Sequence, residues 1–395
     1  MNGRPFARAH GRSAPARARS PFKPLATFAR IAWRDAIGAP AAPAPAHGEH
    51  LLAAERWLCR AQDACGDAGG VSYGYALRGG GWRAPYPETS GYIAATFFRL
   101  GRVRDPSYTE RAQRIVRWLT TVQNRDGSFP NPRYGAGGIV FDTGQALFGL
   151  VCGVEQSRDP ALLEAARRAA AWLTGIAGAD GRWTRSEHLG TPHVYNTRTA
   201  WALLRMNQLE PDARREAVAR ANLDWALAEQ RPSGFFEHSA FRPGRAPFTH
   251  TIAYTARGLL ESGALLHDRR YIDAALRCAD ATLAHLRGDG FLPSTLTTAG
   301  RAASSTCCLT GNCQFAIVWS RLAALAERPD YPAAARCALE YVMATQDLST
   351  PDADVRGAIK GSQPVWGPYA PLSFPNWATK FFVDAMWLAA EGAAR

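Results

Sequence analysis

The chain has 395 residues, of which 47% are hydrophobic and 20% charged, and its formal net charge is +12. This much apolar material excludes intrinsic disorder for the bulk of the chain, because it is enough to build a large core. Residues 1–34 carry eight basic side chains and no acidic one, which leaves 38 basic and 34 acidic side chains in the rest. The basic excess therefore belongs to the N-terminal segment, and the main body is not predicted to bind nucleic acid.

The N-terminal segment, residues 1–45, is predicted to be a basic, disordered leader that precedes a single domain over residues 46–395. It lacks an uninterrupted apolar stretch of signal-peptide length. A solvated leader is the favoured interpretation, and a weak contact with a membrane surface or a partner is the alternative. No apolar run approaches the roughly 20 residues of a membrane span, so no transmembrane segment is expected. Eight scattered cysteines indicate reduced, buried thiols and hence a cytoplasmic protein.

One sequence pattern recurs about every 57 residues from about residue 50 to the end of the chain. A helical stretch ends in an aromatic residue or Leu, often followed by Gln, and then by Gly and an aromatic residue. The anchors of the pattern are Trp57, Trp118, Trp172, Trp225, Leu283 and Tyr341. A fixed period of this length indicates that each unit is one supersecondary element packed on the next.

A second repeated element lies between the anchors, where a short polar segment leads into a helix that is apolar nearly all round. The residues at the matching positions are Glu88, Asp142, Asn196, His250, Leu309 and Asn376. The other helix of each unit, such as residues 161–177, has one apolar face opposite Arg167 and Arg168, which is typical of an outer amphipathic helix. Six such hairpins predict an all-α fold, an (α/α)6 toroid with six inner helices ringed by six outer ones.

The Trp-Leu…Gln…Asp-Gly-aromatic repeat resembles the QW repeats of the terpenoid cyclase and prenyltransferase toroids. The whole pattern also resembles the six-hairpin glycosidase and lyase group. The strings YPETSGY, FDTGQ, THTIAYTARGLLE, CLTGNCQ and PNWATKFF are most similar to toroid proteins associated with bacterial surface-polysaccharide synthesis, over about residues 50–390. This resemblance implies polysaccharide-synthesis machinery as a partner, but a shared fold does not by itself give the reaction.

Parallel inner helices would bring their N-termini to one end of the toroid, around a funnel. The catalytic candidates on its rim and wall are Glu88, Asp142, His250 and Tyr254. The candidate substrate contacts lie on the same rim, one helical turn further in, or in loops near the helix starts. They are Tyr86, Tyr92, Gln145, Tyr195, Asn196, Arg198, Asn312, Gln314, Lys360, Trp366, Asn376 and Lys380. The loop over residues 356–375 has the length of a lid, and an ordinary connector fits it equally well.

The rim residues also have plain structural explanations. Asp142, Asn196 and Asn376 can serve as helix N-caps, which need no catalytic role. His250 is a poor cap and is favoured as a ligand contact, with a structural buried histidine as the alternative. Glu88 follows Pro87 at a turn before its helix, and a functional role and a purely structural role are equally open for it.

The aromatic and polar side chains around the funnel favour a sugar ligand. Glu88 and Asp142 are the kind of carboxylate pair that glycoside hydrolysis needs. Arg198, His250 and Tyr254 would instead suit elimination or epimerisation beside the carboxylate of a uronate sugar. The sequence leaves the choice between these chemistries open.

The sequence therefore predicts a carbohydrate-active hydrolase, lyase or epimerase that acts on a polysaccharide or oligosaccharide with an anionic sugar. Terpenoid cyclisation is the less favoured alternative, because no DxDD or DDxxD string occurs. A non-catalytic glycan-binding component is the third. Cys307, Cys308 and Cys313 lack a usual zinc-ligand spacing, so no metal site is predicted, and no cofactor is expected.

Overall fold

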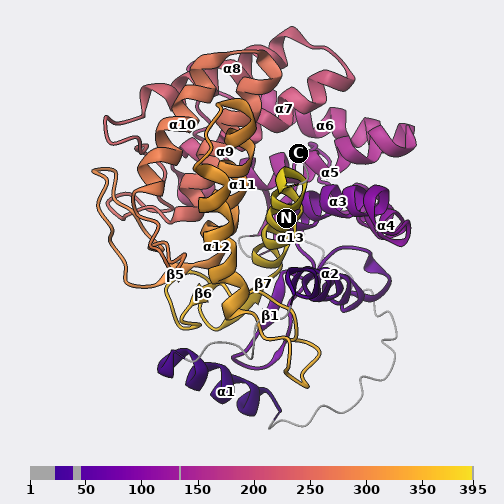
Figure 1. Ribbon diagram of the computed structural model, residues 1–395. Coiled ribbons are helices and arrows are strands. Elements are labelled where there is room, and N and C mark those ends of the chain that lie inside the picture. Colours follow the sequence, from indigo (N-terminus) through magenta and orange to yellow (C-terminus); the bar gives the residue numbers. More distant parts are fainter. Residues whose placement is uncertain (1–22, 39–45, 133–134, 394–395) are drawn as a thin grey trace, which may run out of the picture.

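The computed structural model describes residues 23–38, 46–132 and 135–393, which are mostly helical (Figure 1). The inner helices are α3 (Pro87–Val103), α5 (Val140–Ser157), α7 (Thr197–Leu209), α9 (Thr249–Leu266), α11 (Leu309–Leu325) and α13 (Asn376–Ala393). The outer helices are α2 (His47–Asp63), α4 (Ser107–Val122), α6 (Pro160–Ile176), α8 (Ala213–Ala228), α10 (Arg269–Leu283) and α12 (Tyr331–Thr345). The predicted all-α toroid of six helical hairpins is confirmed.

Contacts between the first and last helices of the domain close the ring. Neighbouring inner helices pack against each other from α3 through to α13, and α13 also contacts α3. Helices α4 to α12 of the outer ring each pack on the inner helix that precedes them, whereas α2 packs on α13. The sixth hairpin therefore joins the two ends of the domain.

The inner ring is tight because small residues stand where its helices meet. A Cβ atom added to Gly91 of α3 would lie 2.3 Å from the carbonyl oxygen of Gln145 in α5. One added to Gly258 of α9 would lie 2.3 Å from the side-chain oxygen of Thr197 in α7. A larger side chain at either position would push the helices apart, since protein interiors have no spare volume.

At four junctions of the outer ring, the glutamine of the sequence repeat ties one outer helix to the next. The side-chain amide of Gln123, after α4, donates to the carbonyl oxygens of Gly127 in the following turn and Ala165 in α6, both at 2.9 Å. The same pair of bonds, to a turn glycine and to a carbonyl of another outer helix, is made by Gln62, Gln230 and Gln346. We call these four residues the glutamine clasps.

Short strands and loops cover the end of the toroid where the inner helices begin. β1 (Gly74–Ala76) pairs antiparallel with β2 (Gly81–Trp82) and with β7 (Ser373–Pro375). The remaining pairs are β3 (Pro130–Asn131) with β4 (Gly135–Gly138) and β5 (Cys307–Cys308) with β6 (Ser362–Gln363). The pairing of β1 with β7 joins loops from opposite ends of the domain.

Part of the segment that the sequence predicts as a leader has a defined structure. Helix α1 (Lys23–Ile37) lies against the loops that follow α12 (Figure 1). The structure therefore differs from the expected disorder over these residues, because they find buried polar partners more than 300 positions away, such as Lys360 for Asp35. Residues 1–22 and 39–45 of the predicted leader lie outside the described residues.

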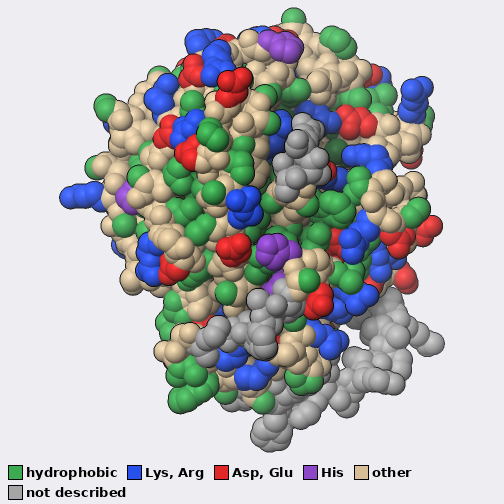
Figure 2. Space-filling model, in the orientation of Figure 1, with side chains coloured by type: hydrophobic (Ala, Val, Ile, Leu, Met, Phe, Trp, Pro, Cys, Tyr) green, Lys and Arg blue, Asp and Glu red, His purple; other side chains and the backbone are tan. Residues whose placement is uncertain are grey.

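Acidic and basic side chains are interspersed over the visible face of the molecule (Figure 2). This mixture agrees with the near-neutral charge expected for the main body. Within the described ranges, none of the helices is both long enough and apolar enough to cross a membrane.

Candidate active site

A cavity of about 1050 Å³ opens at the end of the toroid where the inner helices begin. Its walls come from the first turns of α3, α5, α9 and α13 and from the loops around residues 73–86 and 368–375. Aromatic rings supply a large share of the lining. They belong to Tyr73, Tyr75, Tyr86, Phe141, Tyr195, Phe241, Phe248, Tyr254, Tyr369, Phe374 and Trp377.

Two carboxyl groups enter this cavity from neighbouring inner helices and share a tyrosine. The hydroxyl of Tyr86 donates to Asp142 Oδ2 at 2.9 Å and accepts from Asn131 Nδ2 at 2.6 Å. Tyr86 also hydrogen-bonds with Glu88. Neither carboxylate serves as an N-cap, because α3 and α5 begin without a side-chain cap. The capping explanation for Asp142 is therefore excluded.

The carboxyl group of Asp142 is a weaker acid than an ordinary aspartate. Burial raises its pKa well above the ordinary value, and the nearby charge of Glu88 raises it further. Hydrogen bonds from Tyr86 and Asn131 oppose the rise, because they stabilise the ionised form. Asp142 is only 3% exposed and Glu88 is half-buried. The pair thus combines a carboxylic acid that holds its proton with a carboxyl group closer to solvent.

His250 lies on the opposite part of the wall among aromatic rings. Its ring centroid is 4.2 Å from that of Tyr369, 5.3 Å from Phe241 and 5.7 Å from Tyr254. Burial lowers its pKa to about 3, so the imidazole is neutral at physiological pH. Its buried Nδ1 has no hydrogen-bond partner among the described residues. A neutral imidazole with an unpaired nitrogen can donate to or accept from a ligand, depending on its tautomer.

Arg198 lies beneath the cavity, in a cage of aromatic rings. Its guanidinium carbon is 4.9 Å from the ring centroid of Tyr254 and 5.5 Å from that of Trp201. Its Nε donates to Gln145 Oε1 at 3.0 Å, and burial lowers its pKa to about 10. Arg198 and Gln145 do not line the cavity, contrary to the sequence-based prediction. They support Tyr254 from behind.

The structure brings the four catalytic candidates together, since Glu88, Asp142, His250 and Tyr254 all line the cavity. Of the predicted substrate contacts, Tyr86 and Tyr195 also line it. The others do not, and they are Tyr92, Gln145, Asn196, Arg198, Asn312, Gln314, Lys360, Trp366, Asn376 and Lys380.

Three predicted asparagines hydrogen-bond to the protein instead of reaching the cavity. Asn196 Nδ2 donates to Glu187 Oε1 at 2.6 Å. Asn376 Nδ2 donates to the carbonyl oxygen of Ser72 at 2.8 Å. Asn312 Nδ2 donates to the carbonyl oxygen of Gly290 at 2.8 Å, in a turn that has no glutamine clasp. All three are structural residues, although none forms the side-chain N-cap bond that was the expected alternative for Asn196 and Asn376.

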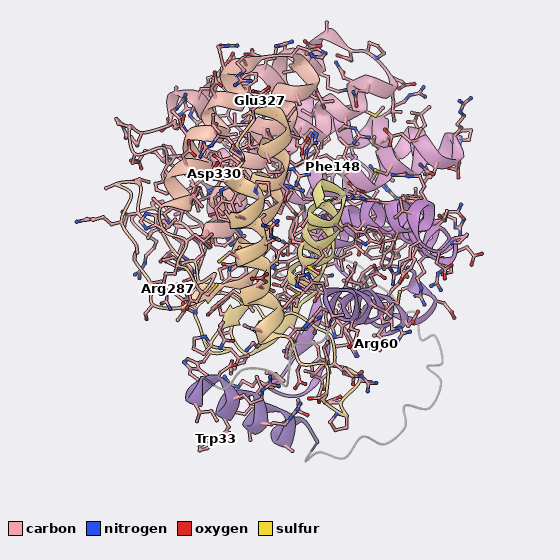
Figure 3. The ribbon with its side chains drawn as sticks, in the orientation of Figure 1. Trp33, Arg60, Phe148, Arg287, Glu327 and Asp330 are labelled. Atoms are coloured by element: carbon pink, nitrogen blue, oxygen red, sulfur yellow. The ribbon has the colours of Figure 1, made fainter. Side chains whose placement is uncertain are left out.

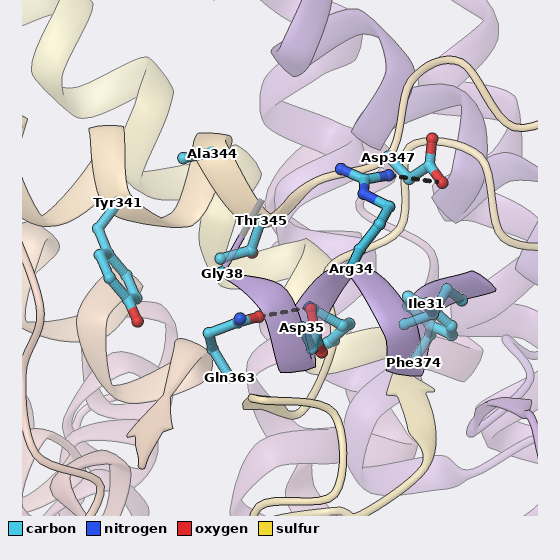
Figure 4. Close-up of a pocket in the computed structure, with 11 residues that line it drawn as sticks. Ile31, Arg34, Asp35, Gly38, Tyr341, Ala344, Thr345, Asp347, Gln363 and Phe374 are labelled. Atoms are coloured by element: carbon cyan, nitrogen blue, oxygen red, sulfur yellow. Dashed lines mark hydrogen bonds and ion pairs between the residues drawn. The ribbon is translucent and has the colours of Figure 1, made fainter. Parts of the chain in front are cut away.

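Lys360, Trp366 and Lys380 also lie away from the cavity. Lys360 pairs with Asp35 of α1 at 2.6 Å, beside a separate cavity of about 300 Å³ (Figure 4). Trp366 is 47% exposed on the surface. Lys380 pairs with Asp384 one turn along its own helix, also at 2.6 Å. The sequence-based prediction put these three side chains near the funnel. In the structure the two lysines form ion pairs away from the cavity, and the tryptophan lies on the surface.

Tyr92 and Gln314 are buried in the inner ring. Tyr92 is 2% exposed and its ring packs on Phe381, with centroids 5.5 Å apart. The side chains of Tyr92 and Gln314 lie beside the Tyr254 hydroxyl, where they oppose the rise that burial causes in the pKa of Tyr254. Burial raises the pKa of Tyr92 well above its ordinary value, and Tyr254 and Glu88 add to this. Both side chains therefore lie behind the wall, close to Tyr254.

The structure adds cavity residues that the sequence-based prediction missed. Arg78, Arg83 and Arg242 place three cations around the cavity, and Phe248 extends its aromatic wall. Phe248 directly precedes α9, as Tyr86 directly precedes α3, so an aromatic residue before an inner helix was a usable signal. The arginines lie in loops and Asn131 lies in β3, where no sequence pattern marks them. No group of three potential metal ligands among His, Cys, Asp and Glu forms within the described residues.

Part of the chain matches a known protein family. Residues 86–259 match the family model described as the squalene-hopene cyclase C-terminal domain. No curated protein sequence matches the chain significantly.

Several solved structures share the fold. An unsaturated glucuronyl hydrolase specific for heparin has a TM-score of 0.70 at 16% identity, covering 88% of this chain and 98% of its own. The unsaturated glucuronyl hydrolase from Bacillus sp. GL1 has a TM-score of 0.68 at 16% identity, with 86% and 96% covered. Cellobiose 2-epimerase from Bacillus thermoamylovorans B4167 has a TM-score of 0.66 at 11% identity, with 92% and 99% covered.

The family match and the shared fold confirm the predicted resemblance to the toroids of terpenoid cyclases and six-hairpin glycosidases. The closer resemblance to proteins of surface-polysaccharide synthesis stays a prediction.

Proposed function

We propose that the cavity hydrolyses a glycosidic bond in an oligosaccharide or polysaccharide that carries an anionic sugar. The observation that carries this proposal is the pair Asp142 and Glu88, joined through Tyr86 in one cavity. Glycoside hydrolysis needs two carboxyl groups whose surroundings separate their acidities, one kept protonated and one ionised. The raised pKa of buried Asp142 meets the first condition.

In the proposed reaction, Asp142 gives its proton to the leaving oxygen as the bond between the anomeric carbon and that oxygen breaks. Glu88 takes a proton from the water whose oxygen forms the new bond to the anomeric carbon. Tyr86 and Asn131 hold the Asp142 carboxyl in one orientation, which saves the entropy of positioning it. Proton transfer then returns both groups to their starting states.

Binding of an anionic sugar is supported by the lining of the cavity. Flat aromatic faces such as those of Tyr195 and Trp377 can stack on sugar rings. Arg78, Arg83 and Arg242 can pair with a carboxylate or sulfate group, and guanidinium groups bind such oxyanions with two parallel hydrogen bonds. The unsaturated glucuronyl hydrolases of the same fold act on anionic polysaccharides by their names. The epimerase or lyase alternative is less well supported, because Arg198 does not reach the cavity.

A terpenoid cyclase-like reaction is the second candidate. The match to the squalene-hopene cyclase C-terminal domain and the aromatic walls favour it, since aromatic faces stabilise cations. In that case buried Asp142 would protonate an alkene.

The test is turnover by the full chain of a panel of uronate-containing, sulfated and neutral oligosaccharides and of linear isoprenoids, followed by mass spectrometry. We expect cleavage of an anionic oligosaccharide with uptake of one water. Asp142→Asn should lose the rate and keep most of the affinity, whereas Gln156→Ala, on the exposed surface of α5, should keep both. Binding of a glycan without turnover would indicate a glycan-binding component, and cyclisation of an isoprenoid would favour the second candidate.

A further inference from the structure

Helix α1 has two faces of different character. Its inward face includes Ile31, which is 5% exposed, and Thr27, which is 7% exposed. Its outward face is an exposed apolar stripe at helical spacing, made of Ala26, Ala29, Trp33, Ala36 and Ile37. We call these five residues the α1 stripe.

Two large side chains of the α1 stripe stand in solvent. Trp33 is 67% exposed and Ile37 is 54% exposed. Figure 3 shows Trp33 on the side of α1 that faces away from the toroid, and Figure 2 shows hydrophobic side chains gathered over this helix. Exposed apolar surface of this kind marks an interaction site when it is contiguous.

The inward face alone holds α1 in place. Asp35 pairs with buried Lys360 at 2.6 Å and accepts from the backbone nitrogen of Val365 at 2.7 Å. Arg34 pairs with Asp347 at 3.0 Å (Figure 4), and Arg30 pairs with the same carboxylate at 2.8 Å. The fold therefore does not require the α1 stripe, and the apolar character of the stripe needs another explanation.

The sequence leading up to the α1 stripe carries charge of one sign. Residues 1–23 contain six basic side chains and no acidic one, while Arg30 and Arg34 of the helix share Asp347. The first acidic residue, Asp35, is turned inward, where Lys360 neutralises it. A basic segment that precedes, in the sequence, an apolar stripe with a tryptophan matches what an anionic bilayer surface attracts, because apolar side chains enter the headgroup region while cations meet the lipid phosphates.

We propose that the α1 stripe, together with the basic segment before it, docks the protein on the surface of an anionic lipid bilayer. The binding is reversible, because one short helix face buries little apolar area. Phe374 lines both the cavity beside α1 and the candidate active-site cavity. Docking would therefore hold the cavity end of the toroid near the membrane. This proposal is independent of the reaction proposed above.

The experiment is co-sedimentation of the full chain with vesicles of phosphatidylcholine alone or mixed with phosphatidylglycerol in a seven-to-three ratio. We expect binding to the mixed vesicles only, and loss of that binding at high salt. Trp33→Ser/Ile37→Ser should weaken it about tenfold. Arg4→Gln/Arg8→Gln/Arg12→Gln should weaken it more, since each cation near an anionic surface contributes about fivefold.

The matched control is Val103→Ser/Leu325→Ser, which removes two other exposed apolar side chains and should bind as the unchanged protein does. Far-ultraviolet circular dichroism checks that each variant is folded. Equal binding to both vesicle types would overturn the proposal, and so would full binding by Trp33→Ser/Ile37→Ser. Self-association without vesicles that this variant abolishes would also overturn it, by showing that the stripe joins two copies of the chain.

Discussion

The outer ring and the cavity rim of this toroid derive from one sequence repeat but use it in opposite ways. In the outer ring, Gln62, Gln123, Gln230 and Gln346 make the same two hydrogen bonds at four places. At the rim, the six matching positions hold five residue types with different surroundings. The repeated residue serves the architecture, and the departures from the repeat supply the candidate catalytic residues.

The rim itself divides into two kinds of position. Glu88, Asp142 and His250 line the cavity, whereas Asn196, Leu309 and Asn376 are fully buried and do not. An alignment of the repeats shows how far along its inner helix a residue lies. It does not show which partner the side chain of that residue contacts. Variants can therefore test two contrasts. One is between cavity-lining and buried positions of the rim, and the other is between the rim and the outer ring.

The largest expected effect contrasts two rim positions. Glu88→Gln should lower kcat about a thousandfold, because it removes the carboxylate proposed to activate water, and should change the unfolding free energy little. Asn376→Ala should destabilise the fold by about 2 kcal/mol, since it leaves the buried Ser72 carbonyl unpaired, with kcat of the folded enzyme largely kept. Rate assays and urea unfolding of both variants measure this. Equal kcat losses in both would contradict the division of the rim.

A glutamine clasp should contribute stability and no rate. Gln123→Ala removes two hydrogen bonds to buried carbonyl oxygens, so we expect a loss of about 2–3 kcal/mol in the free energy of unfolding. Gln156→Ala, an exposed glutamine on α5, should change it by less than about 0.5 kcal/mol. Urea denaturation of the two variants makes the comparison, and similar values would show that the clasps are dispensable.

The raised pKa of Asp142 implies a cost in stability at high pH. The folded chain holds this proton more tightly than the unfolded chain, so stability falls as the pH rises from the ordinary aspartate pKa towards the raised one, by up to about 1.4 kcal/mol per pH unit. Asp142→Asn should remove this dependence and be the more stable protein at pH 8. Thermal melts at pH 5 and pH 8 measure it. A variant that lost stability equally at both pH values would contradict the assigned acidity.

The smallest effect is expected at Trp366, which lies in the loop that the sequence suggested as a lid. It is 47% exposed and outside the cavity lining, so Trp366→Ala should change kcat/KM less than about twofold and stability by less than about 0.5 kcal/mol. Trp377→Ala, in the cavity wall, is the contrasting variant and should raise KM. A strong loss in Trp366→Ala would show that this loop closes over the substrate.

The sequence by itself determined the toroid and the four catalytic candidates. The repeat fixed the number and length of the hairpins, and helical periodicity separated inner from outer helices. Because parallel inner helices start at one end, Glu88, Asp142, His250 and Tyr254 could be brought to one cavity without any knowledge of side-chain contacts.

Only the tertiary structure decided which of the remaining candidates reach the cavity. Asn312 fills the place of an absent glutamine clasp, and Lys360 is drawn to Asp35 on a helix that the sequence suggested was disordered. These outcomes depend on partners far apart in the chain, and a buried polar group goes wherever its hydrogen bonds or opposite charge can be satisfied. The acidity of Asp142 is a tertiary property for the same reason, since burial and the approach of Glu88 raise its pKa.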